Sequence, residues 1–193
     1  MGEIKEGYTR ISAISSAFAG YGKIPSYVLD KAACRGDRVH KIIYDYINDI
    51  SIPEDRFEFM GDRLEGYFES FKKFWTPYET NTIVLQEQRI NDDIEMLTGE
   101  PDLVIKDEGG LTLIDWKATL SIGNHWRIQA EGYSYLLSKV NSMCIDKILF
   151  VKLDKAGGVP VVTEYEPTWD VFEKAYDLYK MFLEKQECNL ERE

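Results

Sequence analysis

Charged residues end an otherwise apolar segment near the middle of the chain. Residues 99–119 read GEPDLVIKDEGGLTLIDWKAT. If residues 111–119 form a strand, alternation places Asp115 and Lys117 on one face, after two leucines. Asp102 lies on the preceding strand, which a short DEGG hairpin joins to this one, so the two carboxylates can converge. Charges that end a half-buried face are partly desolvated, and such charges pair with one another or bind a metal or a substrate.

Two carboxylates and one ammonium group suit metal-assisted hydrolysis of a phosphodiester. Mg²⁺ and Mn²⁺ prefer hard oxygen ligands, and a cation near the scissile phosphate stabilises the charge that develops when water attacks. Taken alone, the same residues also fit a simpler description. In that description Pro101 and Asp102 form a turn, and Asp115 and Lys117 form a same-face ion pair.

Two further polar sites have helical spacing. Gln129 and Tyr133 are four residues apart in WRIQAEGYSYLL, so they lie one above the other on a helix that follows the DWK strand. His40 lies at the margin of an apolar helical face that includes Ile43 and Ile47. Each site, taken alone, also fits an ordinary amphipathic helix with a polar residue at the edge of its core.

The elements that position these residues follow from apolar periodicity and turn signals. Gly36 interrupts the first helical pattern. We predict helices at about 26–49, 61–75, 126–140 and 168–187, and strands at 83–90, 103–106, 111–119, 147–153 and 159–165. This order predicts an α/β fold with a mixed central sheet and helices packed on its faces. We expect one domain over residues 1–193, with a helical part to about residue 78 and a catalytic sheet with its helices from about 79.

Composition restricts the class of protein. The net charge of −11 argues against broad, charge-driven coating of nucleic acid, although Arg35, Arg38 and Lys41 form a local cationic cluster. No apolar run approaches the roughly 18 residues of a membrane span, and MGEIKEGYTR lacks the apolar segment of a signal peptide. We therefore expect a cytoplasmic protein that does not enter the membrane. Three widely spaced cysteines fit reduced thiols better than disulfides or a metal site.

Five motifs, in order along the chain, resemble the PD-(D/E)xK nuclease superfamily. They are G-x-x-x-H ending at His40, a Glu on the first strand at Glu87, GEPD with Asp102, LIDWK with Asp115 and Lys117, and QAEGY from Gln129 to Tyr133. The upstream His and the Q-x-x-x-Y helix are most similar to the RecB-like and lambda-exonuclease-like branch, which includes phage-type exonucleases. The resemblance spans about residues 36–133 and implies a restriction-endonuclease-like core.

The resemblance implies a metal centre that holds Mg²⁺ or Mn²⁺. Asp102 and Asp115 would bind the ion together with the backbone carbonyl of Trp116, and His40 would complete or flank its shell. Lys117 would orient or deprotonate the attacking water and stabilise the charge on the phosphate. The four cysteines that hold an iron-sulfur cluster in some relatives have no counterpart here, so we expect no such cluster.

The remaining motif residues would act around this centre. By resemblance, Glu87 is a further acidic group that acts through water or on a second ion. Gln129 and Tyr133 would hold the nucleic-acid backbone or support the catalytic residues.

The function implied is a Mg/Mn-dependent deoxyribonuclease, an exonuclease that acts on double-stranded DNA ends in phage-type recombination or DNA repair. A single-strand annealing protein and a homo-oligomer are candidate partners by the same resemblance. Two alternatives stay open: a structure- or site-directed endonuclease of the same fold, and a module that binds nucleic acid or protein without cutting. Retention of Asp102, Asp115 and Lys117 argues against the second, because a binding module has no need of this charge cluster.

Overall fold

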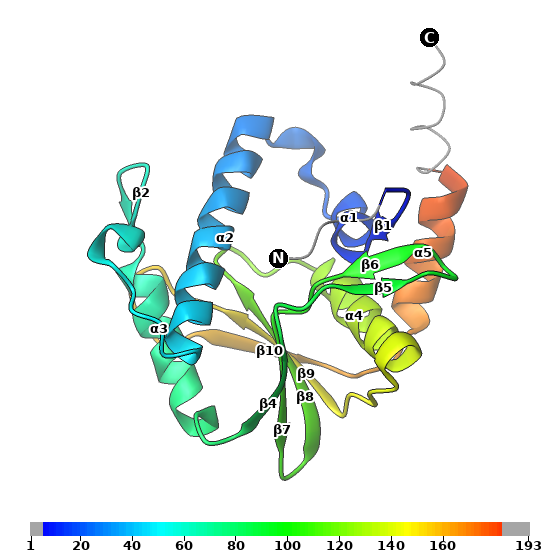
Figure 1. The fold of residues 1–193 in the computed structure, drawn as a ribbon. Coiled ribbons are helices and arrows are strands. Elements are labelled where there is room, and N and C mark those ends of the chain that lie inside the picture. The colour runs from blue at the N-terminus through cyan, green and yellow to red at the C-terminus, as the bar shows by residue number, and fades with distance from the viewer. Residues whose placement is uncertain (1–5, 183–193) are drawn as a thin grey trace.

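A mixed five-stranded sheet forms the centre of the computed structural model, which describes residues 6–182 (Figure 1). In spatial order the strands are β10 (Val161–Tyr165), β9 (Lys147–Lys152), β8 (Gly110–Lys117), β7 (Leu103–Asp107) and β4 (Thr82–Gln86). Among the described strands of this sheet, β8 and β9 alone pair in parallel, and helix α4 (Trp126–Asn141) makes the crossover between them. The predicted α/β class and mixed sheet are confirmed.

Helices α2 (Ser26–Ile47) and α3 (Glu65–Trp75) cover one face of the sheet. Their apolar stripes pack against Ile114 and Trp116, which point to this face from β8. Phe71 contacts Trp116 edge to face, with ring centroids 5.2 Å apart. The alternation predicted for the DWK strand is therefore confirmed on this side.

Helices α4, α5 (Asp170–Phe182) and α1 (Ile11–Ala17) cover the opposite face, as Figure 1 shows to the right of the sheet. Leu113 of β8 and Phe150 of β9 supply the sheet side of this core. Successive residues of β8 thus alternate between two buried cores, which is why the strand reads as an almost continuous apolar run.

The first predicted strand, 83–90, is wrong in its second half. β4 ends at Gln86, and Glu87 adopts a left-handed conformation with φ of 43°, which turns the chain out of the sheet. A separate small sheet follows, in which β6 (Leu97–Gly99) lies between β5 (Ile90–Asp92) and β1 (Thr9–Arg10). The predicted acidic turn exists, but it joins β5 to β6 rather than leading directly to β7.

Other boundaries differ in smaller ways. Helix α2 continues through Gly36 and ends at Ile47, two residues before its predicted end, and Ile50 after it is 46% exposed. The last helix begins at Asp170 instead of residue 168, and its predicted end near residue 187 lies outside the described residues. The elements without a counterpart in the prediction are α1, β1, β6, the hairpin of β2 (Glu58–Phe59) and β3 (Asp62–Arg63), and the 3₁₀ turns η1 (Tyr21–Lys23), η2 (Glu54–Phe57) and η3 (Thr76–Tyr78).

Cys34 and Cys144 are free and exposed, and Cys188 lies outside the described residues. Within residues 6–182, no helix combines the length and apolar character needed to cross a membrane.

Two helical glycines give opposite predictions for the same substitution. A Cβ on Gly66 of α3 would lie 1.8 Å from the carbonyl oxygen of Lys155, whereas a Cβ on Gly36 of α2 meets nothing within 4 Å. We expect Gly66→Ala to lower the free energy of unfolding by about 1–3 kcal/mol through overpacking. Gly36→Ala should raise it by about 0.5–1 kcal/mol, because alanine loses less backbone entropy in a helix. Urea unfolding of both variants measures the two signs, and equal signs would contradict the close approach at Gly66.

Candidate active site

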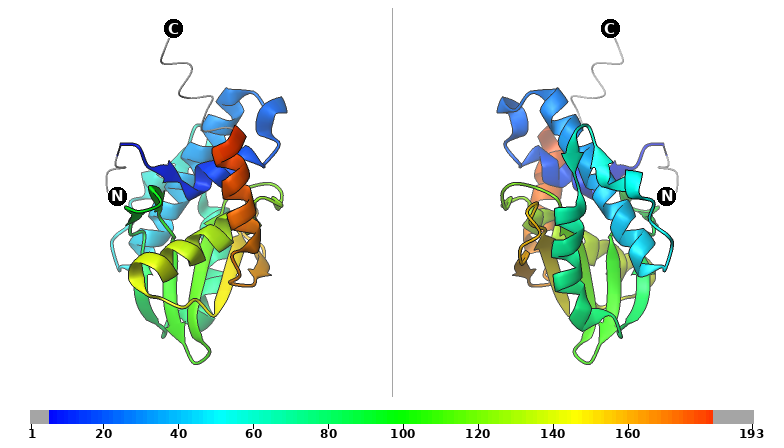
Figure 2. Two further views of the ribbon diagram at one scale, coloured as in Figure 1. Left: turned by 90° about the vertical axis from the view of Figure 1, so that its right-hand side faces the viewer. Right: turned by 90° about the vertical axis from the view of Figure 1, so that its left-hand side faces the viewer.

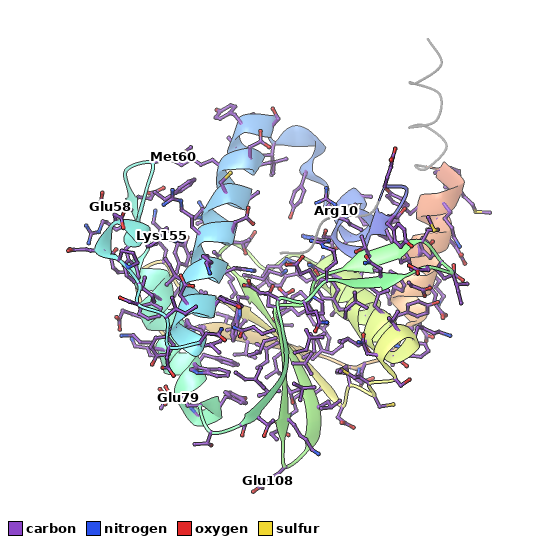
Figure 3. The ribbon with its side chains drawn as sticks, in the orientation of Figure 1. Arg10, Glu58, Met60, Glu79, Glu108 and Lys155 are labelled. Carbon is purple, nitrogen blue, oxygen red and sulfur yellow. The ribbon has the colours of Figure 1, made fainter. Side chains whose placement is uncertain are left out.

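The candidate site lies where β8 ends, at the opposite end of the strand from the β7–β8 turn that Figure 3 marks with Glu108. The β7–β8 register pairs Leu103 with Ile114 and, continued by one residue, sets Asp102 opposite Asp115. Opposite residues of an antiparallel pair share a face, so the two carboxylates converge as the sequence predicts. Both side chains are buried, and Asp115 is only 1% exposed.

Asp102 is held by the backbone of the neighbouring strand and by His40. The N–H of Trp116 donates to Asp102 Oδ2 at 2.7 Å. His40 Nδ1 lies 3.3 Å from Asp102 Oδ1, and its Nε2 lies 3.0 Å from the carbonyl oxygen of Trp116. The imidazole thus contacts both the Asp102 carboxylate and the Trp116 carbonyl. In this arrangement it lies beside the pair of carboxylates and is not part of it.

Asp115 and Lys117 form the second half of the site. The Lys117 ammonium pairs with Asp115 Oδ1 and donates to Gln129 Oε1 at 3.0 Å. Gln129 Nε2 in turn donates to the hydroxyl of Tyr133 at 2.9 Å. Tyr133 is buried, so its contact is with Gln129, and the pair supports Lys117 from helix α4.

Burial and charge act in opposite directions on these groups. Burial, with the help of the Asp102 charge, raises the pKa of Asp115 to about 6, although Lys117 opposes this. Burial also raises the pKa of Asp102, but His40 and Lys117 outweigh it and hold that pKa below its ordinary value. Burial lowers the pKa of His40, yet the charge and hydrogen bond of Asp102 raise it to about 9 overall. His40 is therefore an imidazolium at neutral pH, and both ring N–H groups donate.

The oxygen atoms at this centre fit a divalent cation. These atoms come from only two side chains and one backbone carbonyl. Within the described residues, no cluster of three or more His, Cys, Asp or Glu side chains is arranged to hold a metal ion. The available donors are two carboxylates, from Asp102 and Asp115, and the carbonyl of Trp116. Asp115 Oδ1 is buried and accepts no well-aligned hydrogen bond, although the Lys117 ammonium lies against it. A buried carboxylate oxygen without such a partner is the kind of atom that a hard cation satisfies.

Glu87 reaches the edge of this site from the chain that leaves β4. Its N–H donates to the carbonyl of Asp102 at 3.0 Å. Burial and the Asp102 charge raise the pKa of Glu87 to about 7. Glu87 follows the strand rather than lying on it, so its position depends on the left-handed turn and not on strand alternation.

The QAEGY segment contains two structural residues that the sequence reasoning missed. Glu131 is fully buried, and its Oε2 accepts the N–H groups of Val171 and Phe172 at 2.8 and 3.1 Å. Glu131 therefore caps the first turn of α5. A Cβ on Gly132 would lie 2.6 Å from Ile11 Cγ2, so this glycine allows α1 and α4 to approach. In the sequence, the signal for such a cap was the position of Glu131, a charged residue flanked by small residues on a buried helix.

Removal of this cap should destabilise the fold. Glu131→Ala removes a charged acceptor from one buried and one partly buried N–H group, so we expect the free energy of unfolding to fall by roughly 2–3 kcal/mol. Glu173→Ala is the control, because Glu173 lies on the exposed face of the first turn of α5 and should cost less than about 1 kcal/mol. Urea unfolding compares them, and equal small losses would show that the cap contributes little.

The three residues of the cationic cluster on α2 have different partners. Arg35 donates to the carbonyl of Ala118, directly after Lys117, at 3.1 Å. Arg38 instead donates to the carbonyl of Glu58, and Lys41 pairs with Asp45. Of these three residues, Arg35 therefore contacts the backbone directly after β8.

Comparison with known families agrees with this geometry. The family model of the PD-(D/E)XK nuclease superfamily matches residues 19–181, which is most of the chain. The protein therefore belongs to the PD-(D/E)XK nuclease superfamily, whose members generally use divalent metals. No curated protein sequence matches this chain.

Solved structures are similar to this chain at low sequence identity. An alkaline exonuclease from Laribacter hongkongensis (LHK-Exo) is 14% identical, with a TM-score of 0.52 over 96% of this chain and 91% of that chain. The structure of SSO0001 is 14% identical, with a TM-score of 0.48 over 94% of this chain and 79% of that one. LHK-Exo in complex with dAMP is 16% identical, with a TM-score of 0.43 over 96% and 91%.

Proposed function

We propose that this protein is a Mg²⁺- or Mn²⁺-dependent deoxyribonuclease that degrades linear double-stranded DNA from its ends. The observation that carries the proposal is the convergence of Asp102, Asp115 and the Trp116 carbonyl beside the Lys117 ammonium. Paired carboxylates next to a cation suit in-line attack of water on a phosphodiester and cleavage that leaves a 5′-phosphate. The processing of DNA ends fits a role in recombination or repair.

Each residue of the site has a task in this reaction. Asp102, Asp115 and the Trp116 carbonyl would hold the ion, which when bound supplies Lewis acidity and lowers the pKa of water. Lys117 orients the attacking water and stabilises negative charge at the phosphate. Glu87, whose carboxyl responds to the charge of Asp102, would receive a proton or act on a second ion.

Two groups hold this machinery in position. His40 fixes the Asp102 carboxylate and the Trp116 carbonyl, to which both its ring nitrogens are directed. Gln129, backed by Tyr133, fixes the Lys117 ammonium. These side chains would act next to the scissile phosphate and not on the edges of the nucleobases, so we expect little sequence preference.

Two observations support action at ends. The N-terminal half of α2 and the turn η1 extend beyond the end of the sheet at which β8 terminates (Figure 2). In this proposal these elements would narrow the approach to the site, and a strand end would enter more easily than the middle of a closed duplex. The fold is also that of a protein named as an alkaline exonuclease.

A cleavage assay tests the proposal. Purified protein is incubated with end-labelled linear duplex and with covalently closed circular DNA, in Mg²⁺, Mn²⁺ or EDTA, with Asp115→Asn as the inactive control. We expect nucleotides or short fragments to be released progressively from linear DNA with either metal, while closed circles survive and EDTA stops the reaction.

The other outcomes identify the alternatives. Discrete bands at fixed sites, or rapid nicking of closed circles, would favour an endonuclease. No cleavage with any divalent ion would favour a module that binds without cutting.

A further inference from the structure

The outer edge of β10 is unprotected, unlike the other edge of the same sheet. Neither β10 nor β4 has a second neighbour among the described strands, so each has one open edge. β4 contains a bulge between Ile83 and Leu85, which is one of the ways in which proteins prevent edge strands from pairing with other chains. β10 instead pairs with β9 in a regular register along its whole length. An open and regular edge is a template for a further strand.

Apolar side chains lie along this open edge. Val159 is 79% exposed, and Val161 and Val162 are 47% and 44% exposed. On the face of the sheet that α3 covers, a hollow of about 400 Å³ lies between the end of α3 and β10, and Phe74 and Tyr78 form aromatic walls of it. A strand added to β10 would cover the valines and close the hollow from outside.

The backbone groups of Val162 face the open edge. In a strand, the N–H and C=O of one residue point to the same side, and the side alternates from residue to residue. The N–H of Leu153 donates to the carbonyl of Lys117 in β8, so the preceding residue, Lys152, turns its backbone groups to β10. Lys152 lies opposite Val161, so Val161 bonds to β9. The next residue, Val162, therefore presents its N–H and C=O outward.

We infer that a second copy of this chain pairs with β10 in antiparallel orientation, about a two-fold axis that passes between the two Val162 residues. Each Val162 N–H then donates to the carbonyl of the other Val162, and both valine side chains lie on the face that contains the hollow. Such an interface is isologous, because the same surface is used twice. The two five-stranded sheets become one continuous sheet.

Charge complementarity favours a second copy over an unrelated strand. In this register, Glu164 of the second protomer lies opposite Pro160 of the first. Lys73 is close to that position, because it lines the same hollow as Pro160 and its Nζ donates to the carbonyl of Gly157 at 2.6 Å. Lys73 and Glu164 are both exposed. The axis repeats the contact, so the dimer has two Lys73–Glu164 pairs beside a central pair of valines, a match that an arbitrary strand lacks.

Dimerisation through β10 determines how the two candidate sites are oriented. β8 is parallel to β9, and β9 is antiparallel to β10, so the axis makes the β8 strands of the two protomers antiparallel. Five strand spacings separate these strands, which is roughly 24 Å. The two sites therefore open at opposite ends of the joined sheet. This last consequence rests on the proposed function: one dimer holds two separate DNA ends, and each protomer contains a whole site.

A charge exchange between protomers tests the interface. Sedimentation velocity of the full-length protein, which we expect to be a dimer, measures the dissociation constant. Lys73→Glu and Glu164→Lys each place like charges at both symmetric contacts, so each variant alone should raise that constant by at least about tenfold. An equal mixture of the two variants should dimerise like the wild type, because every contact in the mixed dimer joins a glutamate to a lysine. A contact within one chain cannot produce this rescue.

The matched control is Lys106→Glu, which changes the charge by the same amount. Lys106 is exposed on β7, away from β10. Its substitution should leave the dissociation constant of the dimer unchanged. An equal rise for Lys73→Glu and Lys106→Glu would show an effect of net charge alone and would overturn the assigned contact.

A cysteine at the two-fold axis tests the register. Val162→Cys places two thiols on directly opposite residues, whose Cα atoms lie about 5.5 Å apart, a distance that a disulfide spans. Diamide, which takes up the two thiol hydrogens, should link most of this variant into a covalent dimer. Val84→Cys, on the open edge of β4, and the wild type with its three native cysteines are oxidised in parallel and should stay unlinked.

The outcomes separate this inference from the proposed function. A wild type that is monomeric at every concentration, a mixture of the two charge variants that fails to dimerise, or a Val162→Cys variant that forms no covalent dimer overturns the interface. Lys73→Glu should release nucleotides from linear DNA at the wild-type rate per protomer, because each protomer contains a whole site. A protein that dimerises as described but cleaves no DNA overturns the proposed function and leaves the interface standing.

Discussion

Lys117→Ala should slow DNA cleavage by at least about a hundredfold, the scale of losing one electrostatic or acid-base group at a reacting centre. The Lys117 ammonium contacts both Asp115 and Gln129, so it is held in place before substrate binds. A group fixed in this way acts on the transition state without reorganising. Single-turnover rates with saturating protein measure the effect apart from binding, and DNA affinity in EDTA should change far less than the rate.

A second lysine variant controls for loss of charge alone. Lys147 lies at the start of β9, at the end of the sheet away from the site, and is exposed. Lys147→Ala should leave the cleavage rate unchanged. If Lys117→Ala instead reduced affinity and rate by the same factor, Lys117 would be a phosphate contact and not a group that acts on the reaction.

Asp115→Asn should abolish both cleavage and the stabilisation of the fold by divalent ions. Burial raises the pKa of Asp115, and repulsion by the buried Asp102 carboxylate raises it further; a bound cation removes that repulsion. A ligand at one hundred times its dissociation constant stabilises the native state by about 2.7 kcal/mol. For a chain of this size we therefore expect Mg²⁺ or Mn²⁺ to raise the melting temperature of the wild type by roughly 5–10 °C.

Asp115→Asn should show no such rise, because its side chain is a neutral and weaker ligand. Asp177→Asn serves as the matched control, since that carboxylate is 72% exposed on α5, and its melting temperature should rise like that of the wild type. An equal rise in all three proteins, measured by thermal unfolding with and without the metal, would place the ion elsewhere.

Local pattern in the sequence was sufficient for much of the site. Strand alternation put Asp115 and Lys117 on one side of β8 and Trp116 on the other, and the short hairpin brought Asp102 opposite Asp115. Helical spacing put Gln129 over Tyr133, where a hydrogen bond joins them. These relations hold because the side-chain periods of strands and helices depend on backbone geometry alone.

Tertiary structure decided which groups meet across long separations. His40 reaches Asp102 and Trp116 only because α2 packs on the face of the sheet that Trp116 enters. Glu87 is placed by a left-handed residue that strand propensity does not predict. Such contacts depend on how elements pack and on single backbone angles. Neither of these produces a periodic pattern in the sequence from which the contact could be predicted.

The same limit applies to residues whose partners the sequence reasoning did not predict. In the sequence, Glu131 looks like any helical glutamate, and only the packing of α5 shows that it accepts hydrogen bonds from the first turn of that helix. Arg35 likewise looks like a surface cation, and only the fold places it next to the end of β8. The sequence by itself determined the chemical groups and the faces on which they lie. Packing between distant segments decided their partners, because burial beside a particular backbone group is a property of the assembled fold.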